Sequence, residues 1–315
     1  MVLRPMVLCP VDFSDASRGA LRYAAVLAEH FFAAMTVLRV DDPLFVQTGA
    51  ASYGAGYVER QTHDELDRFV RRAFPGRTPQ IADLRVRQAT GGAGGEILRI
   101  ATEIHADIIV MSTHGTSGFR TAKVGSTTER VLQSTHLPVL VTPAGDPGPE
   151  SLEDWQRDLN VLLVPLDFSA STARQLQIAV GLAEALNTRL LLVHVVEPES
   201  TAGNGKRSVV DGAARSTEAA AQLERLGARL GLPVRPAVIT AQGDPATQIA
   251  RIAREWRAGA IVMALHSGPP SHRRMGAVTH QLLCQTPSLV IAWPPSHPET
   301  RLTRDPARHS KAFAR

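Results

Sequence analysis

Short apolar runs alternate along this chain with longer segments in which apolar residues recur at the spacing of a helix. In the first half, strands are predicted for the apolar runs at 6–11, 35–40, 84–90, 106–111 and 139–142. The helical pattern covers 14–30, 96–105 and 126–134, and the connection 43–80 predicts a loop followed by a helix around 63–73. Strands alternating with helices of this length pair in parallel through right-handed crossovers. We therefore expect an α/β, Rossmann-like fold with a doubly wound parallel sheet of strand order 3-2-1-4-5.

The second half of the chain repeats the first, which indicates a duplication. MVLCPVDFSDAS at 6–17 returns as VLLVPLDFSAST, so that Pro10 and Asp12 reappear as Pro165 and Asp167, each 155 residues later. Further blocks match in the same order, namely 35–43 with 189–198, 97–115 with 249–267 and 137–143 with 287–295. Two tandem domains of the same fold are therefore expected.

The predicted domains cover 1–145 and 159–295. The segment 146–158 between them is rich in Gly, Pro and acidic residues, which is typical of a linker. The final residues, 296–315, are polar and basic without periodicity, so a disordered tail is predicted there.

Composition narrows the class of protein without defining its chemistry. A length of 315 residues suits two domains, and the net charge of +4 lies partly in the tail, with no basic–aromatic pattern that would indicate nucleic acid as a partner. The apolar start is short and lacks a cleavage site, and no apolar run approaches the length of a membrane span, so we expect a cytoplasmic protein. Cys9 and Cys284 are expected to be buried free thiols.

The polar residues that follow the first and fourth strands are the main candidates for a binding site. Doubly wound sheets bind ligands at the carboxyl ends of the strands where the strand order reverses, which here lies between these two strands. Asp12 could accept a hydrogen bond from a ligand hydroxyl or amine, or could belong to the cap of the following helix. Ser14 fits the capping role better because it lies closer to the start of the helical pattern.

A glycine-punctuated stretch follows the fourth strand and ends at a predicted helix. Gly125, Ser126 and Thr127 lie at the start of that helix, where free N–H groups and the helix dipole favour phosphate. Ser126 with Glu129 could instead form a capping box. The counterpart at 264–277 has lost the glycine and the serine, so a phosphate chain is the best remaining reason for Gly115 and Ser126 in the first domain.

Other residues of this glycine-punctuated stretch allow two interpretations each. His114 could contact a phosphate or order the backbone, and Arg120 and Lys123 could screen phosphates or lie in solvent. The glycine-rich segment 91–95 follows the third strand, not the first, and is interpreted as a flexible turn. A Walker A loop, a GxGxxG after the first strand, a nucleophile elbow and a metal-binding cluster are all absent from the sequence.

These motifs resemble the universal stress protein family, over nearly all of 5–143 and 160–294, in a tandem two-domain form. The ATP-binding members carry Gly-x2-Gly-x9-Gly-(Ser/Thr) after strand four. Here Ser112 replaces the first glycine, while Gly115, Gly125 and Ser126 keep the spacing. The resemblance implies an adenine nucleotide alpha-hydrolase-like fold and ATP as the ligand, accompanied by Mg²⁺ or Mn²⁺. It implies that the nucleotide is bound by Pro10, Val11, Asp12, Val40, Met111, Ser112, His114, Gly115, Gly125, Ser126 and Thr127.

Within that set, the resemblance gives Pro10 and Asp12 the adenine and ribose side, and gives Val40 an adenine contact. The second domain keeps Pro165, Asp167, Val195 and Gly276 at corresponding positions. Its loop has lost a glycine, a hydroxyl and one residue of spacing, and Pro269 and Pro270 stiffen it. We expect weaker or absent nucleotide binding there.

The predicted function is an ATP-binding, stress-response regulator that hydrolyses ATP slowly or not at all, since no general base is evident. At most it would be a slow ATPase or an autophosphorylating protein. The alternative is a scaffold that binds no nucleotide, and a transferase or synthetase is disfavoured because its signature motifs are missing. The resemblance also implies an internal pseudo-dimer through the fifth strands, 137–143 and 287–295, or a homodimer, with a regulatory protein as the unknown partner.

Overall fold

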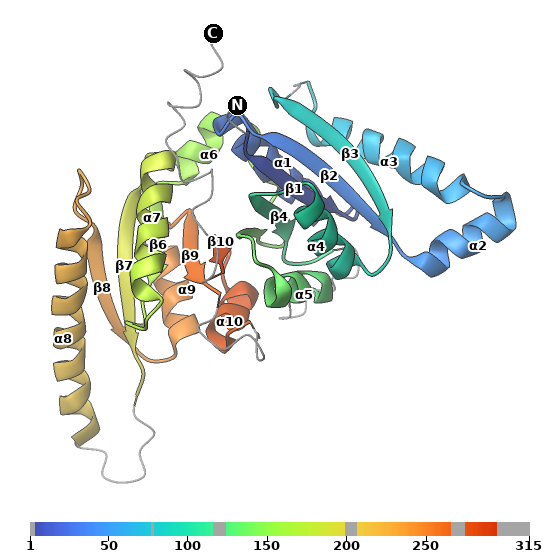
Figure 1. Ribbon diagram of the computed structural model, residues 1–315. Helices are drawn as coiled ribbons and strands as arrows, with labels where there is room; N and C mark the ends of the chain where they lie inside the picture. The colour runs from blue at the N-terminus through green and yellow to red at the C-terminus, as the bar shows by residue number, and fades with distance from the viewer. Residues whose placement is uncertain (1–3, 77–78, 116–123, 199–206, 266–274, 295–315) are drawn as a thin grey trace. The chain divides into compact units, whose positions relative to one another are not determined.

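The computed structural model describes residues 4–76, 79–115, 124–198, 207–265 and 275–294. The chain forms two compact units, the first ending at Arg157 and the second running from Asp158 to Pro295. Each unit is an α/β layer structure in which helices cover both faces of a sheet (Figure 1). Among the described helices, none combines the length and the apolar composition that crossing a bilayer requires.

The first unit contains one parallel sheet of order β3-β2-β1-β4-β5, which confirms the predicted order 3-2-1-4-5. Helices α1 and α3 pack together, as do α4 and α5. The elements are β1 (Met6–Val11), α1 (Asp15–His30), β2 (Ala34–Asp41), α2 (Pro43–Tyr53), α3 (Tyr57–Ala73), β3 (Asp83–Thr90), α4 (Ala93–Glu103), β4 (Ile108–Ser112), α5 (Ser126–Ser134) and β5 (Val139–Thr142), followed at the boundary by α6 (Leu152–Asp158).

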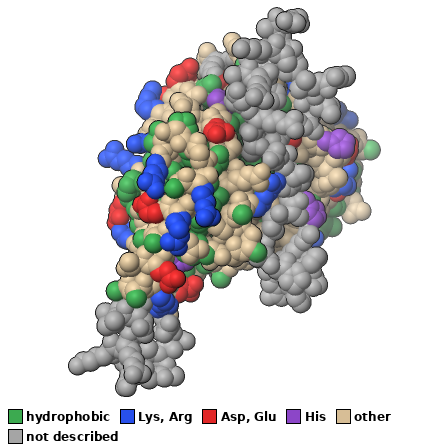
Figure 2. Space-filling view, turned by 60° about the vertical axis from the view of Figure 1, so that its left-hand side comes forward, with side chains coloured by type: hydrophobic (Ala, Val, Ile, Leu, Met, Phe, Trp, Pro, Cys, Tyr) green, Lys and Arg blue, Asp and Glu red, His purple; other side chains and the backbone are tan. Residues whose placement is uncertain are grey.

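The second unit repeats this topology with the order β8-β7-β6-β9-β10, again all parallel. Its elements are β6 (Val161–Pro165), α7 (Thr172–Leu186), β7 (Arg189–Val196), α8 (Arg207–Arg229), β8 (Ala237–Gln242), α9 (Pro245–Glu255), β9 (Ala260–Ala264), α10 (Ala277–Gln285) and β10 (Leu289–Trp293). On the face visible in Figure 2, basic side chains lie interspersed with acidic ones. The predicted tail, 296–315, lies outside the described residues.

The central strands read as continuous apolar runs because helices bury them on both faces. In β1, Val7, Leu8 and Cys9 are fully buried. The following helix begins where the sequence indicates: Ser14 is the N-cap, and its hydroxyl oxygen accepts a hydrogen bond of 3.1 Å from the Ser17 amide.

The connection after β2 differs from the prediction of a loop and one helix, because it forms two helices. Asp42 caps α2 by accepting a bond of 2.8 Å from the Leu44 amide, and Pro43 occupies the first helical position. Helix α2 buries none of its residues, so its sequence carries no apolar periodicity, whereas α3 buries Val58 and Leu66 among others. The helical pattern therefore revealed only α3.

The interpretation of 91–95 as a flexible turn is also wrong, because α4 already begins at Ala93. Only Gly91 and Gly92 form the turn, with Gly92 as the N-cap. A Cβ at Gly94 would lie 2.8 Å from the Cδ of Arg130 on α5, so this glycine allows α4 and α5 to pack closely.

The start of the predicted linker is held against α1. The Tyr23 hydroxyl donates a bond of 2.9 Å to the Asp146 carboxylate, and a guanidinium nitrogen of Arg22 lies 3.4 Å from the carbonyl of Pro147. Further along, Trp155 in α6 is buried, and its ring lies 6.1 Å from that of His30. The segment up to α6 is thus part of the packed first unit.

Replacing Gly19 with alanine is expected to destabilise the first unit by about 1–3 kcal/mol. A Cβ at Gly19 would overlap the backbone carbonyl oxygen of Asp146, which cannot turn aside like a side chain. Urea denaturation followed by circular dichroism measures the loss. Gly95→Ala is the matched control: it lies in α4 with open space around a new Cβ, so it should be neutral or stabilising by up to about 1 kcal/mol. Equal effects of the two variants would show that the contact with Asp146 is unimportant.

The two thiols should differ sharply in reactivity. Neither cysteine forms a disulfide, but Cys9 is buried in β1 whereas Cys284 is partly exposed, so the expectation that both are buried holds only for Cys9. Burial raises the pKa of the Cys9 thiol far above its ordinary value, which suppresses the reactive thiolate. In a disulfide-exchange assay on native protein we expect Cys284 to react first and Cys9 to react only on unfolding. Equal rates in the native protein would contradict this picture.

Candidate functional site

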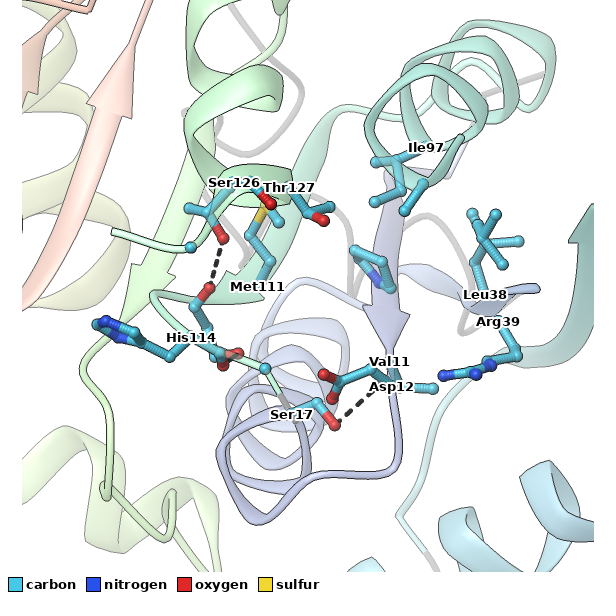
Figure 3. A pocket seen from close by; sticks show the side chains of 17 residues that line it. Val11, Asp12, Ser17, Leu38, Arg39, Ile97, Met111, His114, Ser126 and Thr127 are labelled. Atoms are coloured by element: carbon cyan, nitrogen blue, oxygen red, sulfur yellow. Dashed lines mark hydrogen bonds between the residues drawn. The ribbon is translucent and has the colours of Figure 1, made fainter. Parts of the chain in front are cut away.

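One pocket of the first unit gathers every residue that the sequence predicted for its site. It opens at the carboxyl ends of β1 and β4 and has a volume of about 250 Å³. In Figure 3, Ser126 and Thr127 lie on one side, Leu38 and Arg39 on the other, with Asp12 between them in this view. The predicted residues that line it are Pro10, Val11, Asp12, Val40, Met111, Ser112, His114, Gly115, Gly125, Ser126 and Thr127.

Asp12 shapes the turn after β1 with one carboxylate oxygen. Its Oδ1 accepts bonds from the Ser14 amide (3.1 Å) and the Ser14 hydroxyl (2.6 Å), while Ser14 itself is the N-cap of α1. Phe13 between them has a φ of 67°, in the left-handed region. The capping role thus belongs to Ser14, as the sequence favoured, and Asp12 stays at the mouth of the pocket.

The structure gives a reason for glycine at position 115 that the comparison of the two loops did not show. A Cβ at this position would overlap the Oδ2 oxygen of Asp12. The glycine therefore makes room for the carboxylate at the pocket, and a phosphate chain is not the only reason for it. Gly115 and Asp12 act as a pair, although they lie at the ends of different strands.

Hydrogen bonds join the two ends of the loop between β4 and α5. The Gly125 amide donates to the Thr113 carbonyl (2.8 Å), and the buried Thr128 hydroxyl donates to the Ser112 carbonyl (2.8 Å). The start of α5 is thereby fixed beside the end of β4. Arg120 and Lys123 lie outside the described residues.

Helix α5 presents its N-terminus to the pocket. Gly125 is the N-cap, with extended backbone angles, and no side chain caps the helix. The capping-box interpretation of Ser126 is therefore wrong, because Ser126 is already the first helical residue. Helix geometry leaves the amides of Ser126, Thr127 and Thr128 without acceptors inside the helix. These donors and the helix dipole make this end of the pocket suited to an anion.

Ser112 and His114, at the end of β4, also line the pocket. The Ser112 hydroxyl donates to the His114 carbonyl (2.6 Å), so the serine that replaces the family glycine bonds within its own loop. The Nδ1 atom of His114 lies 3.1 Å from the Thr113 hydroxyl, and its Nε2 is buried with no partner among the described residues. In Figure 3 the His114 ring points away from Asp12 and Thr127, so this nitrogen does not face the cavity.

Sequence reasoning missed the lining residues Ser17, Leu38, Arg39, Ala93, Ile97 and Thr128. Among these residues Arg39 is the charged one. Its Nε lies 2.9 Å from Oδ1 of the buried Asp41, and its guanidinium carbon lies 4.8 Å from the centre of the Phe13 ring. An arginine inside an otherwise apolar strand was the available signal for it.

The second unit has a pocket at the corresponding place, with a volume of about 370 Å³. Pro165, Asp167, Val195 and Gly276, which the sequence assigned to the second domain, all line it. Where α5 has hydroxyl side chains, α10 begins with Ala277 and Val278 after its N-cap. The proline pair 269–270 lies outside the described residues.

The fold and the pockets agree with the comparison to known families. The model of the universal stress protein family matches residues 6–143 and 159–292, so the chain belongs to this family. Its two matches correspond to a tandem two-domain member.

Curated relatives match over about half of the chain. Universal stress protein MJ0531 of Methanocaldococcus jannaschii is 28% identical over 137 residues, which are 43% of this chain and 79% of the relative. Universal stress protein YxiE of Bacillus subtilis is 30% identical over 143 residues, 43% of this chain and 96% of the relative. Among solved structures, a universal stress protein from Archaeoglobus fulgidus superposes with a TM-score of 0.59 at 18% identity, covering 92% of this chain and 96% of its own, a likeness of fold alone.

Proposed function

We propose that the pocket of the first unit binds ATP and that the protein is a nucleotide-dependent stress-response regulator of the cytoplasm. The observation that carries the proposal is the opening of the α5 N-terminus into the same pocket as Asp12 and an apolar wall that includes Val40 and Ile97. A ligand that uses all three surfaces needs an anionic end, hydroxyl groups and a flat apolar part. An adenine nucleotide has this combination.

Each part of the pocket suits one part of the nucleotide. The phosphates would accept hydrogen bonds from the amides and hydroxyls of Ser126 and Thr127. The ribose hydroxyls would donate to Asp12, whose carboxylate Gly115 accommodates. Pro10, Val40 and Met111 would contact the base. Any Mg²⁺ or Mn²⁺ would bind mainly to phosphate oxygens and water, because the described residues contain no group of three acidic, His or Cys side chains arranged for a metal.

Slow hydrolysis or none is expected of this site. The pocket supplies hydrogen-bond donors that position and stabilise the phosphates. Hydrolysis also requires a group that positions an attacking water, and no general base is evident in the sequence. The pairing of the fifth strands, and a regulatory protein as partner, stay predictions from the family resemblance.

A scaffold that binds no nucleotide is the second candidate function. It is favoured by Ser112, whose side chain lines the pocket where the family pattern has a glycine. The serine side chain takes up space that a glycine would leave to the ligand.

Mass spectrometry of small molecules released from the purified protein separates the two candidates. We expect an adenine nucleotide in near-stoichiometric amount from the wild type, and much less from Gly125→Asp protein prepared in parallel. No nucleotide from the wild type, together with no detectable binding when ATP is added back with Mg²⁺, would favour the scaffold.

A further inference from the structure

We propose that the pocket of the second unit is a ligand site of its own, which takes an uncharged nucleoside in place of a nucleotide. The ligand class rests on the proposed function of the first unit, because it follows from comparing the two pockets. The existence of the site rests only on the second unit's own cavity of about 370 Å³ and its lining.

The apolar wall is the same in both pockets. Pro10, Val40, Ile97 and Met111 in the first unit correspond to Pro165, Val195, Ile249 and Met263 in the second, and all of these line their pockets. The backbone at the mouth also matches, since Phe13 and Phe168 both have left-handed φ angles of 67° and 57°. Asp167 follows β6 as Asp12 follows β1, and its Oδ1 accepts a bond of 2.9 Å from the Ser169 amide. The surface for a flat base and for ribose hydroxyls is therefore retained.

The phosphate side is retained only in its backbone, since α10 also has a glycine N-cap, Gly276, and no capping side chain. Its side chains differ. Ser126 and Thr127 correspond to Ala277 and Val278, so two hydroxyl donors at the helix start are replaced by apolar groups. Valine has nearly the shape of threonine, and Val278 lines the second pocket as Thr127 lines the first. The change therefore removes donors without closing the space.

The charges that line the second pocket also oppose a phosphate. Asp167 and Glu197 are both lining residues, and none of the described lining residues is Lys or Arg. Both carboxylates are exposed, so water screens them and their repulsion of an anion is modest. This repulsion favours an uncharged ligand, as does the loss of the two hydroxyl donors.

His194 adds a hydrogen-bond acceptor where the first unit has Arg39. Its Nδ1 lies 2.7 Å from the Leu166 carbonyl oxygen, and a carbonyl can only accept, so Nδ1 carries the proton. With the proton on Nδ1 alone, Nε2 can accept a hydrogen bond from a ligand. The ring is held by stacking on Phe168, with 4.3 Å between centres. His194, Asp167 and Glu197 together suit a ligand rich in N–H and O–H donors, as adenosine is.

Calorimetric titration of the full chain with adenosine and with ATP tests the proposal. Val40→Trp fills the first pocket and Val195→Trp fills the second; both valines are only partly buried. We expect adenosine to bind Val40→Trp protein at least about 10-fold more tightly than ATP does, and Val195→Trp added to Val40→Trp to remove this adenosine site. Adenosine binding that survives in the Val40→Trp/Val195→Trp double variant, no adenosine binding to Val40→Trp protein at millimolar concentration, or equal affinities for both ligands would overturn it.

A restoring variant tests the reason for the preference. In the Val40→Trp background, Ala277→Ser with Val278→Thr should raise ATP affinity about 10-fold and leave adenosine affinity unchanged. Unchanged ATP affinity would show that the hydroxyls do not set the preference. If Val195→Trp fails to fold, Asp167→Ala, at an exposed side chain, should weaken adenosine binding instead. Failure of the proposed function appears separately, as wild-type and Val195→Trp proteins that both bind no ATP.

Discussion

Gly125→Asp is expected to lower the affinity of the first unit for ATP by at least about 100-fold. Gly125 is the N-cap of α5, so the new carboxylate would lie at the helix end where the phosphates are proposed to bind. Two like charges about 5 Å apart repel by about 3 kcal/mol at an effective dielectric constant of about 20, which corresponds to a loss of this size. Aspartate is itself a good N-cap, so the helix should still form. Calorimetry with ATP and Mg²⁺ measures the change.

Gly125→Asn separates charge from size. Asparagine has the shape of aspartate and also caps helices well, but it brings no charge. A Cβ here would lie 3.0 Å from the Thr113 carbonyl oxygen, so both variants impose the same slight crowding. We expect Asn to reduce ATP affinity far less than Asp, and Gly276→Asp in the second unit to leave the affinity of the first unit unchanged. Equal losses with Asn and Asp would show that space, not charge, explains the effect.

Gly115→Ala is expected to weaken ATP binding about 10-fold and to destabilise the first unit by about 1–3 kcal/mol. The new methyl group would overlap Oδ2 of Asp12, whose Oδ1 is already bonded to Ser14. The carboxylate must then rotate, which disturbs the turn before α1 and withdraws the proposed partner of the ribose. Urea denaturation gives the stability change, and calorimetry gives the change in affinity.

A double-mutant cycle with Asp12→Ala tests whether the two residues act as a pair. In the Asp12→Ala background the overlapping oxygen is gone, so Gly115→Ala should cost little further stability. Additive losses in the double variant would show that the alanine acts through the backbone of its own loop, and the proposed contact with Asp12 would then be wrong.

The sheet order and much of the lining of the candidate pocket could be predicted from patterns along the sequence. Buried strands appear as apolar runs, as in β1. Because the chain is duplicated, the pattern of each element occurs twice. Polar residues follow β1 and β4, and the carboxyl ends of these adjacent parallel strands lie close together.

What the sequence missed depends on packing between distant segments. Helix α2 buries no residue, so it leaves no periodic pattern. Gly94 makes room for Arg130 of α5, and Gly115 makes room for Asp12. Arg39 was overlooked although Asp41 lies two residues further along the same strand, and its contact with the Phe13 ring forms only in the folded unit.

Titration of wild-type protein with ATP and Mg²⁺ in a calorimeter tests the central claim most directly. The account predicts saturable binding that Val40→Trp removes and Val195→Trp leaves in place, because the first unit's pocket holds the nucleotide. No heat of binding at millimolar ATP from nucleotide-free, folded wild-type protein would contradict it, as would ATP binding that persists in Val40→Trp with unchanged affinity.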